Sequence, residues 1–276
     1  MSTASHHPNT SLPRILCLHG GGTNARIFRA QCRVLERSLS STFRLCYAQA
    51  PFTSQPGSDV TAVYKTFGSF RAWLRWRPED PELDNVSAVT LIENAVRDAM
   101  KEDDEMGGRG AWVAVLGFSQ GAKIGASLLF DQQLRAELGM GRRNGWPEFK
   151  FGVLLAGRGP LVSLTPELGT LPGMAEASSS SVLSPSEERD FPPMERPLTV
   201  PTIHVHGLHD PGLELHRKLL RRCCDAKSVR LIQWEGEHRV PIKTNDVGVV
   251  VNAILAIARE TGAIDESELI DGYLSR

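Results

Sequence analysis

A serine, an aspartate and a histidine follow separate apolar segments of this chain in an order that suits nucleophilic catalysis. Ser119 lies in the sequence Gly-Phe-Ser-Gln-Gly, a G-x-S-x-G pattern, and Asp210 and His238 come later. A serine hydroxyl is a poor nucleophile until a neutral imidazole accepts its proton, and a carboxylate must hold that imidazole in one tautomer. We therefore expect Ser119 to attack, His238 to act as the base and Asp210 to orient His238.

The acid of this group has alternatives in the sequence. Asp210 precedes Pro211, and an aspartate at such a place often only begins a turn. Asp84 and Glu237 are the other carboxylates that we consider for the role. The order serine, aspartate, histidine, which is that of α/β-hydrolases, favours Asp210.

The base also has competitors. His206 and His209 lie near Asp210 in the sequence and compete with His238, which the chain order favours. His204 alternates into the interior of its predicted strand. We expect His19 to make a structural hydrogen bond that shapes the glycine loop following it, rather than to transfer protons.

The surroundings of Ser119 indicate a nucleophile elbow. Residues 112–116 are apolar and rich in β-branched side chains, which is typical of a strand buried on both faces. The segment that begins at Ser119 has apolar residues at helical spacing. Gly117 and Gly121 leave room for a strained turn between strand and helix. A serine at this position can also be an ordinary helix N-cap, but strand, turn and helix together favour the elbow.

Backbone N–H groups near the elbow can stabilise an oxyanion. Three glycines, Gly20 to Gly22, follow the first predicted strand and can expose their amides to an anion. We expect the N–H of Gln120 and that of Gly21 or Gly22 to bind the carbonyl oxygen during acyl transfer. One such donor is worth roughly 3–4 kcal/mol.

The elements that must position these groups alternate between strands and helices. The predicted strands are residues 14–19, 43–48, 112–116, 150–156, 201–206 and 229–234, and the predicted helices are 24–39, 86–105, the segment after 119, 212–223 and 247–258. This order predicts an α/β fold with a doubly wound, mainly parallel sheet of about six strands and helices on both faces. We expect one domain over 14–262, with a flexible tail at 1–13 and a C-terminal tail at 263–276. The acidic end of the second helix, at 102–105, opposes the helix dipole and predicts fraying.

Two long segments lack periodicity. Residues 50–85 contain many aromatic side chains, which argues against disorder, and we interpret this segment as a flap in which Phe52, Phe70 and Trp73 wall a substrate pocket; the alternative is an ordinary surface excursion. Residues 161–198 include a serine-rich stretch and predict either a mobile loop over the pocket or a plain insertion. Arg158 is a candidate for binding a substrate carboxylate or phenolate, or for pairing with a nearby acid.

Composition narrows the class of partner. The net charge of -1 and the lack of a basic stretch argue against nucleic acid. No apolar run is long enough for a membrane span or a secretory signal. The cysteines are odd in number and show no metal-like spacing, which favours reduced thiols inside the cell. We therefore expect a cytoplasmic protein without a metal site, membrane contact or nucleic-acid partner.

Several motifs together resemble the FSH group of serine hydrolases. They are LCLHGGGTNARIF, APF after the second strand, GFSQGA, HGLHD and GEHRVP, and they extend over nearly the whole chain. The resemblance implies an α/β-hydrolase fold, the triad Ser119, Asp210 and His238, and no metal or organic cofactor. It also implies either a small esterase or a stand-alone thioesterase that releases a polyketide or fatty acyl chain, with a polyketide synthase as a possible partner. We favour the thioesterase, because the aromatic residues between 64 and 76 can line an apolar acyl pocket. The single motifs also occur in carboxylesterases and acyl-protein thioesterases, and a binding protein without catalysis is the remaining alternative.

Overall fold

Six parallel strands form the central sheet of this protein. The computed structural model describes residues 10–57, 60, 64, 66–75, 79–143, 145–179 and 191–265. The strands are β1 (Arg14–Leu18), β2 (Arg44–Ala48), β5 (Trp112–Phe118), β6 (Phe151–Leu155), β9 (Thr202–Gly207) and β10 (Val229–Trp234), in the order β10-β9-β6-β5-β1-β2. Every neighbouring pair is parallel. The predicted doubly wound α/β-hydrolase sheet is confirmed, and each strand corresponds to a predicted one.

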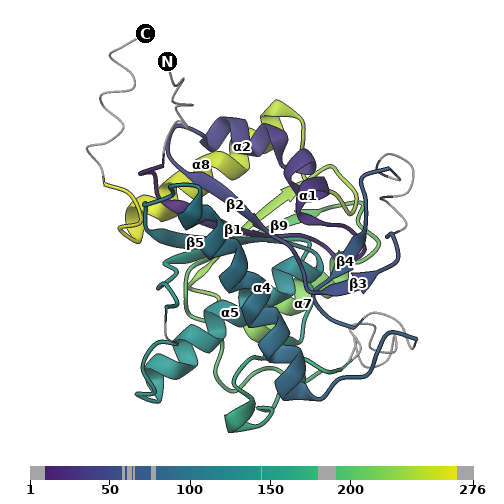
Figure 1. The fold of residues 1–276 in the computed structure, drawn as a ribbon. Coiled ribbons are helices and arrows are strands. Elements are labelled where there is room, and N and C mark those ends of the chain that lie inside the picture. Colours follow the sequence, from purple (N-terminus) through teal and green to yellow (C-terminus); the bar gives the residue numbers. More distant parts are fainter. Residues whose placement is uncertain are drawn as a thin grey trace, which may run out of the picture.

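Helices cover both faces of this sheet (Figure 1). One face carries α1 (Ala25–Gln31), α2 (Arg33–Leu39) and α8 (Thr244–Glu260), and the other carries α4 (Asn85–Glu105), α5 (Gln120–Glu137) and α7 (Leu213–Cys223). In β1, Ile15 packs into the first of these layers and Leu16 into the second. Burial on both faces explains the continuous apolar runs of the strands. The single helix predicted for 24–39 is interrupted at Cys32, which caps α1 and precedes α2.

The acidic end of α4 is tied to the sheet. Asp103 is buried, and its carboxylate accepts hydrogen bonds from Arg44 at 2.6 Å and Arg14 at 3.2 Å. Asp104 also pairs with Arg14. The prediction of fraying here is wrong, because two arginines from neighbouring strands compensate for the unfavourable helix dipole.

Part of the segment 50–85 forms a short antiparallel hairpin. Its strands are β3 (Phe52–Ser54) and β4 (Phe70–Ala72). Trp73 follows β4 with an exposed fraction of 0%, and its indole N–H donates to the carbonyl oxygen of His19 at 2.9 Å. The interpretation of 50–85 as a flap is therefore wrong around Trp73, which is fixed in the core. Residues 58–59, 61–63, 65 and 76–78 lie outside the described residues.

The beginning of the segment 161–198 is also ordered. It contains β7 (Leu161–Ser163), the single-turn helix η1 (Pro166–Leu168) and β8 (Met174–Glu176), and the two strands form a small parallel sheet. The interpretation of the whole segment as a mobile loop or plain insertion is wrong for these residues, since Leu161 and Val162 are buried. Three-residue strands are too short to show a periodicity in the sequence. Residues 180–190, with most of the serine-rich stretch, lie outside the described part, so the proposed lid is untested there.

The described chain extends beyond the predicted domain boundaries. The Thr10 carbonyl accepts the N–H of Arg109 at 2.7 Å, and the Pro13 carbonyl accepts that of Arg44 at 2.9 Å. Residues 10–13 are therefore part of the domain rather than of a flexible tail, and Ile264 is buried at the other end. Residues 1–9 and 266–276 lie outside the description. Among the helices described, none has both the length and the apolar character needed to cross a membrane.

Candidate active site

Ser119 occupies a sharp turn between β5 and α5. Its backbone has φ 53 and ψ −115, a strained conformation for a residue with a side chain. A Cβ atom at Gly117 would lie 2.3 Å from the carbonyl oxygen of Gly121, and one at Gly121 would lie 2.1 Å from that of Leu18. Both glycines are required because strand and helix approach so closely. The Ser119 N–H donates to Leu155 at 2.8 Å, which holds the turn against β6.

A continuous chain of hydrogen bonds joins Ser119 to Asp210. His238 Nε2 lies 3.0 Å from Ser119 Oγ, and His238 Nδ1 lies 2.6 Å from Asp210 Oδ2. Because a carboxylate only accepts, Nδ1 carries the proton and Nε2 is left to accept the serine hydroxyl proton. Asp210 follows β9 and His238 follows β10, so the parallel sheet brings the carboxyl ends of three strands to one edge.

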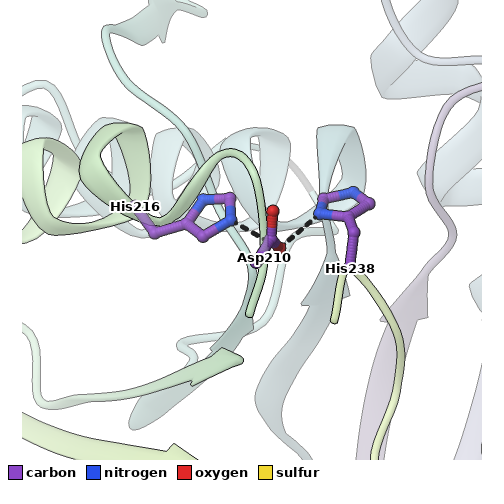
Figure 2. A group of neighbouring side chains, drawn as sticks. All are labelled: Asp210, His216 and His238. Carbon is purple, nitrogen blue, oxygen red and sulfur yellow. Dashed lines mark hydrogen bonds and ion pairs between the residues drawn. The ribbon is translucent and has the colours of Figure 1, made fainter. Parts of the chain in front are cut away.

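The Asp210 carboxylate is buried, and both of its oxygen atoms accept hydrogen bonds. Its Oδ1 accepts the Gly212 N–H at 2.7 Å, and its Oδ2 accepts from His238 and also from His216 at 2.8 Å (Figure 2). Burial alone would raise the pKa of Asp210, but the hydrogen bonds from His216 and His238 outweigh it and hold the pKa far below the usual range. Asp210 is therefore ionised despite its burial.

The other carboxylates considered have structural roles. Asp84 is the N-cap of α4 and accepts the Ser87 N–H at 2.9 Å. Glu237 is exposed and pairs with Arg239 at 2.7 Å. Neither lies in the hydrogen-bond chain that ends at Ser119.

The competing histidines also lie outside that chain. His209 is exposed and contacts Glu235 at 2.7 Å. His206 is buried in β9, and within the described residues neither of its ring nitrogens has a hydrogen-bond partner. Burial lowers the pKa of His206 to about 4, so it is neutral near pH 7. His238 alone of the three candidates touches Ser119.

The glycine loop lies beside the serine. A Cβ atom placed on Gly20 would be 3.5 Å from Ser119 Cβ. The Gly22 N–H donates to the Arg71 carbonyl at 2.9 Å. The prediction of Gly22 as an oxyanion donor is therefore wrong in this conformation, because its N–H already has an acceptor. No hydrogen bond from the Gly21 amide occurs among the described residues. Gln120 is the first residue of α5, where helix amides lack intrahelical acceptors.

His19 holds this loop in shape, as expected. Its Nδ1 lies 2.8 Å from the Gly20 carbonyl oxygen, and its Nε2 accepts the Ala50 N–H at 3.1 Å. The ring is therefore protonated on Nδ1 and neutral. Burial lowers the pKa of His19 to about 4, which keeps it in this form.

The predicted pocket residues lie in different surroundings. In the hairpin, Phe52 pairs with Ala72 and Phe70 pairs with Ser54, so both phenylalanines lie on one face, where they are half-buried. Trp73 is wrong as a wall residue, because its side chain is enclosed by the core. The Arg158 guanidinium lies beside Gly212, within 2.6 Å of where a Cβ would stand.

Sequence reasoning missed His216, the second histidine on Asp210. It lies in α7, six residues after Asp210. A histidine in the helix that follows the aspartate is only a weak indication of such a contact. Sequence spacing does not show which face of the helix is turned toward Asp210.

Asp210, His216 and His238 are also the group, within the described residues, whose ligand atoms come close enough to suit a metal ion. These atoms are already joined by hydrogen bonds of 2.6 and 2.8 Å. Ligands around a tetrahedral zinc ion stand roughly 3.4 Å apart. The geometry therefore fits direct hydrogen bonds better than shared coordination.

The chain is similar to known proteins over most of its length. The sequence model of the family described as "Serine hydrolase (FSH1)" matches residues 9–250. "Esterase dbaE" of Emericella nidulans is 56% identical over 260 residues, covering 92% of this chain and 93% of that protein. "Esterase pigG" of Monascus ruber is 54% identical over 257 residues, covering 92% and 94%. The crystal structure of esterase PE8 aligns with a TM-score of 0.48 at 19% identity, covering 90% of this chain and 93% of that one.

Proposed function

We propose, from the premise that this chain belongs to the serine hydrolase (FSH1) family, that it cleaves an acyl thioester through an acyl-serine intermediate. Family membership confirms the resemblance seen in the sequence and makes the protein a hydrolase of the esterase type. The unbroken hydrogen-bond chain from Ser119 through His238 to Asp210 carries the mechanistic part of the proposal.

In the first half of the reaction Ser119 Oγ attacks the acyl carbon while its proton passes to His238 Nε2. Asp210 stabilises the imidazolium that forms and fixes its tautomer. His238 then gives the proton to the leaving thiol or alcohol. In the second half, water attacks the acyl-serine with His238 again as base, and the acid is released.

We assign stabilisation of the oxyanion to the backbone N–H groups of Gln120 and Gly21. Gln120 begins the helix that follows the serine, and Gly21 lies in the loop that passes beside Ser119. Two donors aimed at the position of the developing charge supply the largest electrostatic contribution in acyl transfer.

The proposed substrate is a polyketide or fatty acyl chain held as a thioester on a carrier, and its partner would be a polyketide synthase in the cytoplasm. The half-buried face of Phe52 and Phe70 supports this choice, since it offers an apolar surface on the hairpin that is bonded to the glycine loop. Arg71 makes that bond by accepting the Gly22 N–H.

A carboxylesterase acting on small oxygen esters is the second candidate, because the relatives that match most of this chain are named esterases. Turnover of long-chain acyl thioesters and of short oxygen esters separates the two. The thioesterase proposal predicts a higher kcat/KM for the long thioesters, and hydrolysis of short oxygen esters alone would overturn it.

Labelling with a fluorophosphonate tests the nucleophile itself. We expect one adduct on Ser119 in the folded protein and none after Ser119→Ala. A folded protein that forms no adduct would favour the alternative of a binding protein without catalysis.

A further inference from the structure

His216 is a buried histidine that the proposed reaction does not use. Its exposed fraction is 0%, and its ring lies between two oxygen atoms. Nε2 is 2.8 Å from Asp210 Oδ2, and Nδ1 is 3.0 Å from the carbonyl oxygen of Gly157 (Figure 2 shows the Asp210 contact). Asp210 is thus held between two imidazoles, His216 on one side and His238 on the other.

The hydrogen-bond partners of His216 fix the number of its protons. A backbone carbonyl only accepts, so Nδ1 facing Gly157 must carry a proton. A carboxylate also only accepts, so a second proton must lie between Nε2 and Asp210 Oδ2. A neutral imidazole has a single N–H and cannot make both bonds. The pair of Asp210 and His216 therefore holds one proton more than a carboxylate beside a neutral ring.

That extra proton belongs on His216. Asp210 Oδ1 already accepts the Gly212 N–H, and Oδ2 already accepts the N–H of His238, so the carboxylate is surrounded by donors. Such an environment favours the ionised acid, in line with the strongly lowered pKa of Asp210. A buried ion pair persists when its geometry is close and its remaining lone pairs are satisfied, as they are here.

The backbone at the other end of the ring is also fixed in an unusual way. Ala156, which precedes Gly157, has a φ of 49, a strained value for a residue with a side chain. Its N–H donates to Val205 at 3.0 Å. The turn at the end of β6 is therefore held in place where it presents the Gly157 carbonyl to His216.

We propose that His216 is a positioning residue that is protonated on both nitrogens and aims Asp210 at His238. The proposal rests on the proposed roles of Ser119, His238 and Asp210. With an imidazole on each side of Oδ2, the carboxylate has little freedom to rotate and stays in line with His238 Nδ1.

Other charged and titratable groups face this cluster and bear on its pH dependence. The ring of His206 from β9 lies 5.6 Å from that of His216, and the ring of His238 lies 5.8 Å from it. Arg158, after β6, lies beside Gly212, whose N–H donates to Asp210. His206 is neutral near pH 7, because burial lowers its pKa to about 4, and Arg158 is cationic, so Asp210 is the anion that His216 meets.

Nitrogen NMR of the histidine side chains tests the protonation state directly. In wild-type protein labelled with 15N-histidine at pH 7, both ring nitrogens of His216 should show attached protons, and the His216→Gln spectrum assigns them. A His216 ring with one unprotonated nitrogen overturns the proposal. This measurement needs no turnover, so it separates failure of this proposal from failure of the proposed hydrolase activity.

Two substitutions test the effect on catalysis. His216→Gln keeps one donor for Asp210 without the charge, and His216→Phe keeps neither. We expect kcat to fall by about 10-fold or more in His216→Phe and by less in His216→Gln, with KM changed by less than about 2-fold. The pH–rate profile should change in both variants, because each substitution removes the positive charge beside Asp210. A folded His216→Phe protein with wild-type kcat and a wild-type pH–rate profile would also overturn the proposal. The control is His209→Gln at an exposed position, which should change neither kcat nor the pH–rate profile.

Discussion

The side chain of Gln120 forms hydrogen bonds with the backbone of Trp73 and Leu74. Its Oε1 accepts the Trp73 N–H at 2.6 Å and the Leu74 N–H at 3.3 Å, and its Nε2 donates to the Leu74 carbonyl at 3.3 Å. The residue after the nucleophile therefore does more than offer its own amide to an oxyanion. It also fixes the end of the hairpin, and the Arg71 carbonyl of that hairpin accepts the N–H of Gly22 in the glycine loop.

Gln120→Ala should consequently lower both stability and activity. The two amides lose their acceptor in a half-buried place, which costs about 1–3 kcal/mol of the free energy of unfolding. We expect kcat to fall as well, because the hairpin whose Arg71 carbonyl accepts the Gly22 N–H loses its anchor. Urea unfolding and ester turnover measure the two effects.

Gln133→Ala is the matched control. Gln133 also joins two backbone groups, accepting from Thr199 at 2.8 Å and donating to Pro197 at 3.1 Å, but away from Ser119. It should lose similar stability and keep its kcat. Equal losses of kcat in both variants would show that the Gln120 contact matters only for folding.

The triad assignment predicts a distinct outcome for each member. Ser119→Ala should abolish turnover without unfolding the domain, because the side chain it removes is small and half-exposed. Asp210→Asn should lower kcat by roughly 10⁴-fold, since an amide stabilises the wrong tautomer of the imidazole. Steady-state kinetics with circular dichroism checks both, and near wild-type turnover in Asp210→Asn would move the acid elsewhere.

The elbow itself predicts a large difference between two Gly-to-Ala substitutions. A Cβ at Gly121 would lie 2.1 Å from the Leu18 carbonyl oxygen, whereas nothing lies within 4 Å of a Cβ at Gly248 in α8. Gly121→Ala should therefore destabilise the protein by several kcal/mol or prevent folding, because backbone must move. Gly248→Ala should stabilise it by about 0.5–1 kcal/mol, the helix-propensity gain. Thermal unfolding compares them, and a Gly121→Ala protein as stable as wild type contradicts the observed strand-to-helix approach.

The local parts of this site could be read from the sequence. The strand, the two glycines and Ser119 occupy one short stretch, and the apolar runs of the six sheet strands are continuous because both faces are covered. These features depend on neighbours in the chain, so pattern alone identifies them.

The contacts that complete the site were not readable in this way. Gln120 meets Trp73 across 47 positions, and Arg14 meets Asp103 across 89. His216 faces Asp210 only because of the phase and direction of α7. The sequence shows an amphipathic helix there but not its orientation about its own axis. The contact between His216 and Asp210 could therefore not be predicted from the sequence.

Arg158 gives a prediction about substrate charge. Its guanidinium lies beside Gly212, whose N–H donates to Asp210 Oδ1. If it binds a carboxylate or phenolate of the substrate, Arg158→Ala should raise KM for acidic esters and leave KM for neutral esters of the same length unchanged. An unchanged KM for the acidic esters would leave Arg158 with a structural role.

Buried neutral histidines make stability depend on pH. Burial lowers the pKa of His19 to about 4, of His204 to about 3 and of His206 to about 4, against about 6.5 in the unfolded chain. Below pH 6.5 the unfolded chain therefore binds protons that the folded protein does not, and stability falls with decreasing pH. Each histidine removes roughly 1.4 kcal/mol per pH unit below pH 6 until its folded-state pKa is reached, with little effect above about pH 7.5.

Urea unfolding at pH 7.5, 6 and 5 measures this slope, roughly 4 kcal/mol per unit at most if all three histidines act independently. His206→Leu should reduce the slope by about a third, without loss of stability at pH 7.5, because its ring nitrogens make no hydrogen bonds within the described residues. His209→Gln, at an exposed position, should leave the slope unchanged. A free energy of unfolding that stays constant from pH 7.5 to 5 would mean that these histidines take up protons in the folded protein, which would require water or a partner group beside each ring.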